Sequence, residues 1–354
     1  MRLRFATLRR EGGRVPLTVI PALVLAFALI CGGSAVAQES PADAAARRMG
    51  RGVNILGFDG VWEGGVDAPF RFKYFHMLRE AGFRHVRINL HAFRHMDDAH
   101  RIDPAVLMRL DDVLDRAIGA GLVPVIDEHD FSQCQREPDW CTVRLKAFWT
   151  QVSARYAKRF PSAIYEILNE PGGSMTLAQW SALLADTIRI IRRHGPDRTI
   201  VAALLNVEAP LAQRIPSLPE ADRNIVVTVH YYRPMAFTHQ GAPWLPELAT
   251  RTGVDWGRPA DEAKLAADLE EVAGWARAQR RPIYLGEFGV YDSAPIAARA
   301  RYVASVARNA ERLGWPWAYW QFDHDFALFD TTREAWVRPV LDALVPPRRA
   351  GRTR

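Results

Sequence analysis

The sequence predicts a single α/β domain, a (β/α)8 barrel in which eight parallel strands alternate with helices. Short β-branched or apolar runs recur along the chain, and amphipathic stretches separate them. No Ser/Gly/Pro-rich linker or change of composition divides residues 38–344. An open doubly wound sheet would need a glycine-rich phosphate turn after its first strand, and GFDGVWEGG lacks the required G-x-G-x-x-G spacing. Eight units in about 300 residues therefore favour a closed TIM barrel.

Eight apolar runs are predicted to be the strands of this barrel. Each is short and contains β-branched or aromatic residues, which is typical of buried strands. The predicted strands cover residues 51–56, 85–90, 123–128, 164–168, 199–204, 225–230, 282–287 and 317–321.

The stretches between these runs are predicted to be helices, including residues 70–82, 103–121, 176–195 and 261–279. Several end in glycine just before the next strand, where a helix C-cap is expected. Asp103 precedes a proline, which is the pattern of an N-cap followed by proline at the first helical position.

The amino-terminal segment has the three-part pattern of a secretory signal peptide. Five arginines come first, an apolar run follows over residues 15–30, and Ala-Val-Ala suits a cleavage site. The apolar run is shorter than the ~20 residues of a spanning helix. We therefore expect a signal peptide over residues 1–37, a barrel domain over 38–345 and a basic, disordered tail over 346–354. The protein would be secreted or periplasmic; an uncleaved anchor is the alternative.

The basic charge of the chain belongs to its two ends. The formal net charge is +6, but residues 1–37 and the residues from 345 onward carry +4 each, which leaves −2 for the body. A nucleic-acid partner is therefore not expected.

Two cysteines of the body, Cys134 and Cys141, lie seven positions apart in CQREPDWC. In an oxidising compartment a disulfide between them is the favoured interpretation, and free thiols are the alternative. A metal site is not favoured, because no histidine or second cysteine pair accompanies them at ligand spacing. Cys31 leaves a lipoprotein open, although the bulky Ile30 precedes it.

Functional side chains gather at the predicted carboxyl ends of the strands, which is where barrels carry their chemistry. Ordinary turns favour Gly, Asp, Asn and Ser. Here the strand ends carry Arg87, Asp127-Glu128-His129, Asn169-Glu170, His230-Tyr231-Tyr232, Glu287 and Trp320.

Two of these side chains, Glu170 and Glu287, suit the cleavage of a glycosidic bond. That reaction needs an acid to protonate the departing oxygen and a carboxylate to attack or to activate water. We expect Arg87 and Tyr232 to hold Glu287 ionised, and a less polar pocket to keep Glu170 protonated. Asn169 would bind the sugar 2-hydroxyl. Trp320 offers a flat apolar face for a sugar ring.

The chain resembles glycoside hydrolase family 5 over residues 52–330. The resemblance lies in GFRHVRINL, LVPVIDEHD, YEILNEP, VTVHYY, YLGEFGV and WAYWQF, in family order. It implies a (β/α)8 barrel that cleaves β-linked polysaccharides with retention, without a cofactor. It also implies Glu170 as the acid/base and Glu287 as the nucleophile, and substrate-binding or supporting roles for Arg87, His129, Asn169, His230, Tyr232 and Trp320.

Within that family, HYYRPMAFTHQGAPW resembles a loop of bacterial endo-β-1,4-glucanases. The resemblance implies an endoglucanase whose two carboxyl groups lie roughly 5 to 5.5 Å apart. Glu128 and Asp130 depart from the family pattern and leave the substrate open. The alternatives are another β-glycan (mannan, xyloglucan or mixed-linked glucan), a silent glycan-binding barrel, and a metal-dependent hydrolase using Asp127, His129 and His230.

The expected partner is a β-linked polysaccharide or oligosaccharide. It would be bound by a monomer that has no stable membrane insertion after signal cleavage.

Further residues near the strand ends and in loops are weaker candidates for the site. Glu166 and Glu208 are interpreted as structural. Side chains that could line sugar subsites from loops on the active face are Trp62, His91, His95, His239 and Trp244.

Overall fold

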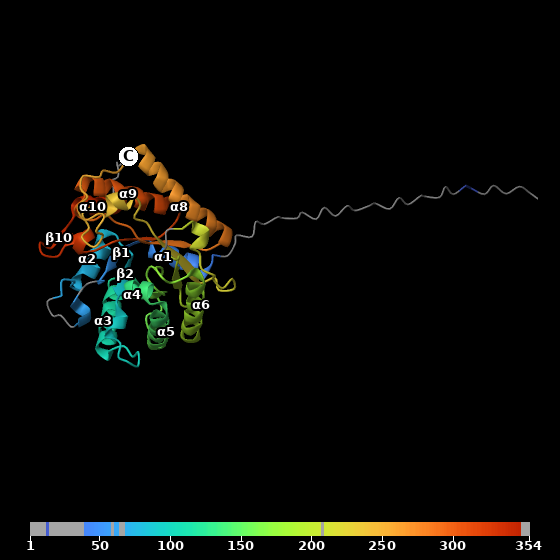
Figure 1. Ribbon diagram of the computed structural model, residues 1–354. Helices are drawn as coiled ribbons and strands as arrows, with labels where there is room; N and C mark the ends of the chain where they lie inside the picture. The colour runs from blue at the N-terminus through green and yellow to red at the C-terminus, as the bar shows by residue number, and fades with distance from the viewer. Residues whose placement is uncertain (1–11, 14–38, 58–59, 64–67, 207–208, 348–354) are drawn as a thin grey trace, which may run out of the picture. The chain divides into compact units, whose positions relative to one another are not determined.

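Eight parallel strands close into a barrel in sequence order, and β8 pairs with β1 (Figure 1). This computed structural model describes residues 12–13, 39–57, 60–63, 68–206 and 209–347. The predicted (β/α)8 fold is confirmed. The strands are β1 (Arg51–Ile55), β2 (His85–Leu90), β3 (Val123–Glu128), β4 (Ile164–Glu166), β5 (Ile200–Ala203), β6 (Ile225–His230), β7 (Ile283–Glu287) and β8 (Trp317–Tyr319).

The strand limits agree with the sequence-based prediction most closely at β2, β3 and β6. The strand β4 ends earlier than predicted, at Glu166 rather than at residue 168. Beyond Glu166 the chain bonds to a helix: the carbonyl of Ile167 accepts a hydrogen bond from the indole of Trp149, in a helix between β3 and β4, at 2.9 Å. The chain therefore leaves the regular ladder just before Asn169 and Glu170.

Helices surround the strands, as Figure 1 shows for α3, α5 and α6. The helix α5 packs against α6, and α9 packs against both α8 and α10. Asp103 caps α3 as predicted, because its carboxylate accepts from the amide of Ala105 at 2.8 Å. The helices are α1 (Pro41–Met49), α2 (Lys73–Ala81), α3 (Pro104–Gly119), α4 (Phe131–Arg136), α5 (Pro138–Arg155), α6 (Leu177–His194), α7 (Met235–Thr238), α8 (Pro259–Gln279), α9 (Ile296–Arg312) and α10 (Arg338–Leu344).

Short elements complete the fold. Four 3-10 turns lie in loops, and an antiparallel pair follows β8. These elements are η1 (Gly60–Glu63), η2 (Ala92–His95), η3 (Leu211–Gln213), η4 (His324–Phe326), β9 (Phe329–Asp330) and β10 (Ala335–Trp336).

The helix α1 covers the amino-terminal end of the barrel. Its buried face contributes Ala42, Ala45 and Met49 to a small core that includes the early strand residues Ile164 and Val226. Closing this end leaves the carboxyl end of the barrel for the functional groups.

The predicted signal peptide lies almost wholly outside the described residues, as does most of the predicted tail. The described residues from 39 onward form one compact unit. Within the described part of the chain, no helix combines the length and the apolar character needed to cross a membrane.

Candidate active site

Arg87 lies fully buried inside the barrel and contacts carboxylates from three strands. Its guanidinium donates to both oxygens of Glu166 at 2.7 and 2.9 Å and to Glu287 Oε1 at 2.6 Å. It also lies 3.1 Å from Asp127 Oδ2. Burial would lower the pKa of Arg87, but these three negative charges outweigh burial and raise it well above its ordinary value. Arg87 is therefore a fixed positive charge beneath the site.

Glu287 ends β7 and is held by two donors. Its Oε1 accepts from Arg87, and its Oε2 accepts from the hydroxyl of Tyr232 at 2.9 Å. The side chain is only 6 % exposed. Arg87 and Tyr232 are the two partners that the sequence predicts for this carboxylate.

Glu170 follows β4 and has a positive φ of 38°. Its Oε1 lies 2.8 Å from Nδ1 of His230, which comes from the end of β6. Burial raises the pKa of Glu170, but the hydrogen bond and the charge of His230 outweigh burial, so the net pKa is lowered. The expectation that an apolar pocket keeps Glu170 protonated in the free protein is therefore wrong, because the pocket contains His230.

The pKa of His230 shifts in the opposite direction to that of Glu170. Burial lowers the pKa of His230, but the charge of Glu287 and the bond to Glu170 raise it above its ordinary value of 6.5. Its Nδ1 also lies 3.5 Å from Glu287 Oε2. The imidazole of His230 thus lies between the two carboxylates.

The separation of Glu170 and Glu287 is short. One carboxylate oxygen of each, together with a ring nitrogen of His230, lies within 4.8 Å of the others. An inverting glycosidase needs roughly 6.5–9.5 Å between its carboxyl groups to admit water, whereas a retaining one has roughly 5–5.5 Å. The spacing fits direct attack by one carboxylate.

Asn169 is buried beside this pair. Its Oδ1 accepts from Arg87 at 2.8 Å, and its backbone amide donates to the carbonyl of Glu128 at 2.8 Å. Because the amide oxygen is already used, the side-chain NH2 group is left to donate to a ligand.

His129 and Trp320 form a stacked pair next to the carboxylates, with ring centroids 5.5 Å apart and an interplanar angle of 8°. His129 Nδ1 also lies 2.5 Å from Asp127 Oδ2. Burial, followed by the positive charges of His91 and Arg87, lowers the pKa of His129 well below its ordinary value. A neutral His129 therefore supports the indole face of Trp320.

A cleft of about 1020 Å³ opens over these groups. Two of the weaker candidates line it, His239 and Trp244, and Trp244 is 46 % exposed. Trp62 does not act as a subsite: it is buried, and its indole donates to the carbonyl of Leu56 at 2.9 Å. The cleft is also lined by the following residues that the sequence predicts for the site: His129, Asn169, Glu170, His230, Tyr232, Glu287 and Trp320.

The other weaker candidates lie elsewhere. His91 is 3.6 Å from Asp130. Neither His91 nor His95 is among the described residues that line the cleft. Glu166 is structural, as expected, because both its oxygens hold Arg87. Glu208 lies outside the described residues.

Two asparagines belong to the site and are absent from the sequence-based set. Asn54 in β1 accepts from Arg87 at 2.9 Å and from Asn89 at 3.1 Å. Asn89 in β2 also donates to Asp127 at 3.0 Å. Asn54 stands between the apolar Val53 and Ile55, and Asn89 lies two positions after Arg87 in β2. Alternate residues of a strand share a face, so the spacing from Arg87 is the signal that could have identified Asn89.

The chemistry of the donor set does not favour a resident metal. Among the described residues, one group has ligand atoms close enough for an ion, namely Glu170, His230 and Glu287. Their atoms already have protein partners, since Arg87 and Tyr232 donate to Glu287 and His230 bonds to Glu170. Asp127 and His129, which the metal-dependent alternative would use, are bonded to each other.

The two body cysteines lie close to this rim. Cys134 in α4 and Cys141 in α5 form a disulfide, and both residues are fully buried.

Comparison with known proteins finds one matching family and several relatives named as endoglucanases. The profile of the family described as cellulase (glycosyl hydrolase family 5) matches residues 47–325. Endoglucanase H of Acetivibrio thermocellus is 25% identical over 319 residues, which cover 85% of this chain and 33% of the relative. Endoglucanase A of Clostridium longisporum is 22% identical over 275 residues, covering 71% and 50%. The chain thus spans a third to a half of the length of these curated relatives.

Solved structures agree. Endoglucanase Cel5A of the hyperthermophile Thermotoga maritima superposes with a TM-score of 0.80 at 33% identity, covering 86% of this chain and 100% of that one. The cellulose synthase subunit Z of Clostridioides difficile superposes with a TM-score of 0.77 at 30% identity, covering 84% and 99%.

Proposed function

The chain belongs to glycosyl hydrolase family 5, and on that premise we propose that it is a retaining endo-β-1,4-glucanase. The observation that carries the proposal is the pair of carboxylates within 4.8 Å of each other, each in a different environment. Glu287 is bound by two donors, Arg87 and Tyr232, whereas Glu170 shares a proton with His230. Two carboxyl groups with different partners can act as nucleophile and acid.

In the first step, a carboxylate oxygen of Glu287 attacks the anomeric carbon. The bond to the departing sugar breaks, and its oxygen takes the proton of Glu170. That proton reaches Glu170 from His230 along the 2.8 Å hydrogen bond. The result is a glycosyl ester on Glu287 and a shortened chain with a free hydroxyl.

In the second step, water replaces the ester. Glu170, now a carboxylate, accepts a proton from water while the water oxygen bonds to the anomeric carbon and Glu287 leaves. The ester has removed the charge of Glu287, which is the first of the influences that raise the pKa of His230. With a lower pKa, His230 competes less for the proton that Glu170 takes from water. This suits the change of Glu170 from acid to base.

The cleft supports a β-1,4-glucan as substrate. Trp320 and Trp244 offer aromatic faces, and Asn169, whose side-chain oxygen accepts from Arg87, also lines the cleft. The endoglucanase Cel5A of Thermotoga maritima has been solved with cellobiose and with mannotriose. We therefore propose cellulose or a related β-glucan, and a panel that includes mannan, xyloglucan and mixed-linked glucan tests this choice.

The amide variants Glu170→Gln and Glu287→Gln test the function itself. On carboxymethyl-cellulose we expect Glu287→Gln to lose at least about 10³-fold in kcat, because the nucleophile is gone. Glu170→Gln should lose about 10²–10⁴-fold. Glu80→Gln, on the exposed face of α2, is the control and should keep full activity. Full activity of Glu287→Gln would refute the assignment, and sugar binding without product release by the unaltered protein would favour the silent barrel.

We also propose that the mature protein is secreted or periplasmic, monomeric and not inserted in a membrane. The leader pattern over residues 1–37 and the disulfide between Cys134 and Cys141 support export. Edman sequencing of the exported protein would locate its first residue, and light scattering would give its mass in solution.

A further inference from the structure

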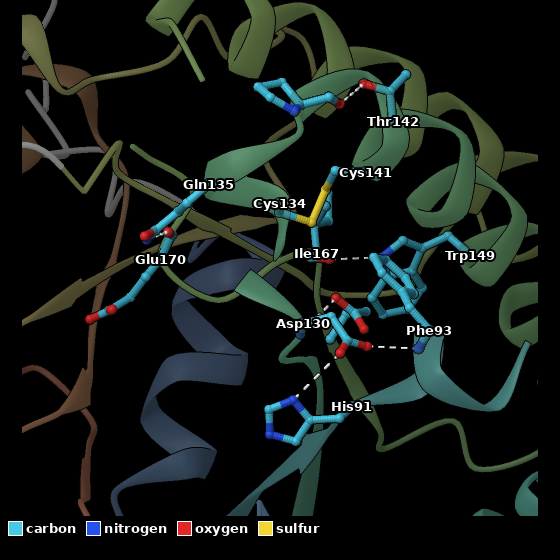
Figure 2. The surroundings of a disulfide bond; sticks show 12 residues. His91, Phe93, Asp130, Cys134, Gln135, Cys141, Thr142, Trp149, Ile167 and Glu170 are labelled. Atoms are coloured by element: carbon cyan, nitrogen blue, oxygen red, sulfur yellow. Dashed lines mark hydrogen bonds and ion pairs between the residues drawn. A yellow bond between two sulfur atoms is a disulfide. The ribbon is translucent and has the colours of Figure 1, made fainter. Parts of the chain in front are cut away.

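The helices α4 and α5 lie beside the loop that carries Glu170 (Figure 2). The disulfide between Cys134 and Cys141 joins these two helices. Gln135 follows Cys134 and points toward the loop that carries Glu170, as the close-up shows. The disulfide and the burial of Cys134 thus fix the chain immediately before Gln135.

Gln135 bonds to the Glu170 loop through both its side chain and its backbone. Its Nε2 donates to the carbonyl of Glu170 at 2.9 Å. Its own carbonyl accepts from the amide of Ser174 at 2.7 Å. A side chain at Gly173 would place its Cβ 2.7 Å from Gln135, so the two segments can approach this closely only because residue 173 is glycine.

Glu170 has a backbone conformation that needs such support. Its φ of 38° lies in the left-handed region, which is strained for a residue with a side chain. Such a conformation persists when neighbouring contacts fix it. The bond from Gln135 fixes the carbonyl of Glu170, and with it the direction in which the carboxyl leaves the backbone toward His230.

The same two helices also hold the chain just before this loop. Trp149 of α5 donates to the carbonyl of Ile167 at 2.9 Å. Gln135 itself is not among the described residues that line the cleft. A change at Gln135 would therefore act on Glu170 without removing a substrate contact.

We propose that Gln135, held by the Cys134–Cys141 disulfide, is a positioning residue for the general acid Glu170. This proposal rests on the proposed function, because it assumes that Glu170 protonates the leaving group. Displacement of a catalytic group by about 1 Å can cost 10²-fold in rate. The loss should appear only where protonation of the leaving group matters.

Two aryl β-cellobiosides separate acid catalysis from other losses. Phenol is a poor leaving group and needs a proton, whereas dinitrophenol departs without one. The value of kcat/KM reports the step that forms the glycosyl ester. Gln135→Met keeps the length of the side chain and removes its donor. Gln133→Met, on the same helix, is the matched control, since Gln133 bonds to Glu137 and Arg136 rather than to the Glu170 loop.

For Gln135→Met we expect kcat/KM to fall about tenfold on the phenyl substrate and less than about twofold on the dinitrophenyl substrate. Gln133→Met should change neither. An equal loss on both substrates, or no loss on either, would overturn the proposal while leaving the proposed function standing. If the unaltered protein hydrolysed neither substrate, the proposed function would itself fail.

The double variant Cys134→Ala/Cys141→Ala tests the part played by the disulfide. If it holds Gln135 in place, this variant should show the same selective loss on the phenyl substrate, with a cooperative thermal transition as proof of folding. Equal kcat/KM to the unaltered protein on both substrates would remove the disulfide from the proposal. Should the double variant not fold, the outcome for Gln135→Met still decides the role of Gln135.

Discussion

The hydrogen bond between Glu170 and His230 decides where a proton lies in the free protein. The two groups shift in opposite directions, with the pKa of Glu170 lowered and that of His230 raised. A proton that the two groups share therefore lies on His230 rather than on Glu170. Sequence reasoning identified both residues but could not predict this division, because it depends on the 2.8 Å contact between two different strand ends.

This division predicts the alkaline side of the pH profile. Activity is lost when the shared proton leaves, so the alkaline limb of kcat/KM should lie above pH 6.5, the ordinary value for histidine. In His230→Asn the proton must bind Glu170 alone, and the limb should move to lower pH. His76→Asn, on the exposed face of α2, is the control. An alkaline limb that stays in place in His230→Asn would contradict the shared proton.

Glu128 predicts a second pH effect, on stability. It is fully buried beside Asp130, whose backbone amide donates to Glu128 Oε2 at 3.2 Å. Burial and then the charge of Asp130 raise the pKa of Glu128 well above 4.5. Between the unfolded and the folded pKa the native state binds more protons, so its stability falls as the pH rises.

The neutral variant Glu128→Gln escapes this loss. Its free energy of unfolding should gain on that of the unaltered protein as the pH rises above 4.5, by up to about 1.4 kcal/mol per pH unit. Urea denaturation at pH 4.5 and 6.5 measures the difference. The exposed Glu80→Gln should show none. A difference that did not grow with pH would mean that Glu128 is not protonated in the native state.

At the scale of elements, Arg87 ties the strands of the barrel together. From β2 it reaches Asn54 in β1, Glu166 in β4 and Glu287 in β7. The sequence placed Arg87 near the rim, because the pattern gives its position along the strand. It could not show that Glu166 shares the same guanidinium, since that contact joins strands far apart in the chain.

Removing this cation should destabilise the barrel strongly. Arg87→Met leaves buried carboxylates without their partner, and we expect a loss of about 3–5 kcal/mol in the free energy of unfolding. Arg338→Met removes an exposed arginine that pairs with Asp342 in α10, and it should change stability far less. Equal urea midpoints and slopes for the two variants would contradict the central role of Arg87.

For the molecule as a whole, the eight-strand alternation predicted the barrel, because each βα unit has a local signature. The pattern also predicted that Glu170 and Glu287 lie together, because a barrel brings the ends of its strands to one rim. It missed Asn54 and Asn89, whose side chains matter only once strands β1 to β3 lie side by side. It could not give the cleft, because loops around residues such as Trp244 have no periodic pattern.

Closure of the barrel also sets the separation of the two carboxylates, on which the proposed retention depends. Glu170 follows β4 and Glu287 ends β7, and closure brings their oxygens within 4.8 Å. At this distance Glu287 can form a bond to the sugar itself. A fluorinated cellobioside with a dinitrophenyl leaving group slows the second step and would trap that bond.

Peptide mass spectrometry after reaction with dinitrophenyl 2-deoxy-2-fluoro-β-cellobioside tests most directly whether Glu287 is the nucleophile. We expect inactivation with one fluorocellobiosyl group, attached to Glu287. Attachment to Glu170 would exchange the two roles. Continued turnover without any labelled peptide would contradict the covalent mechanism.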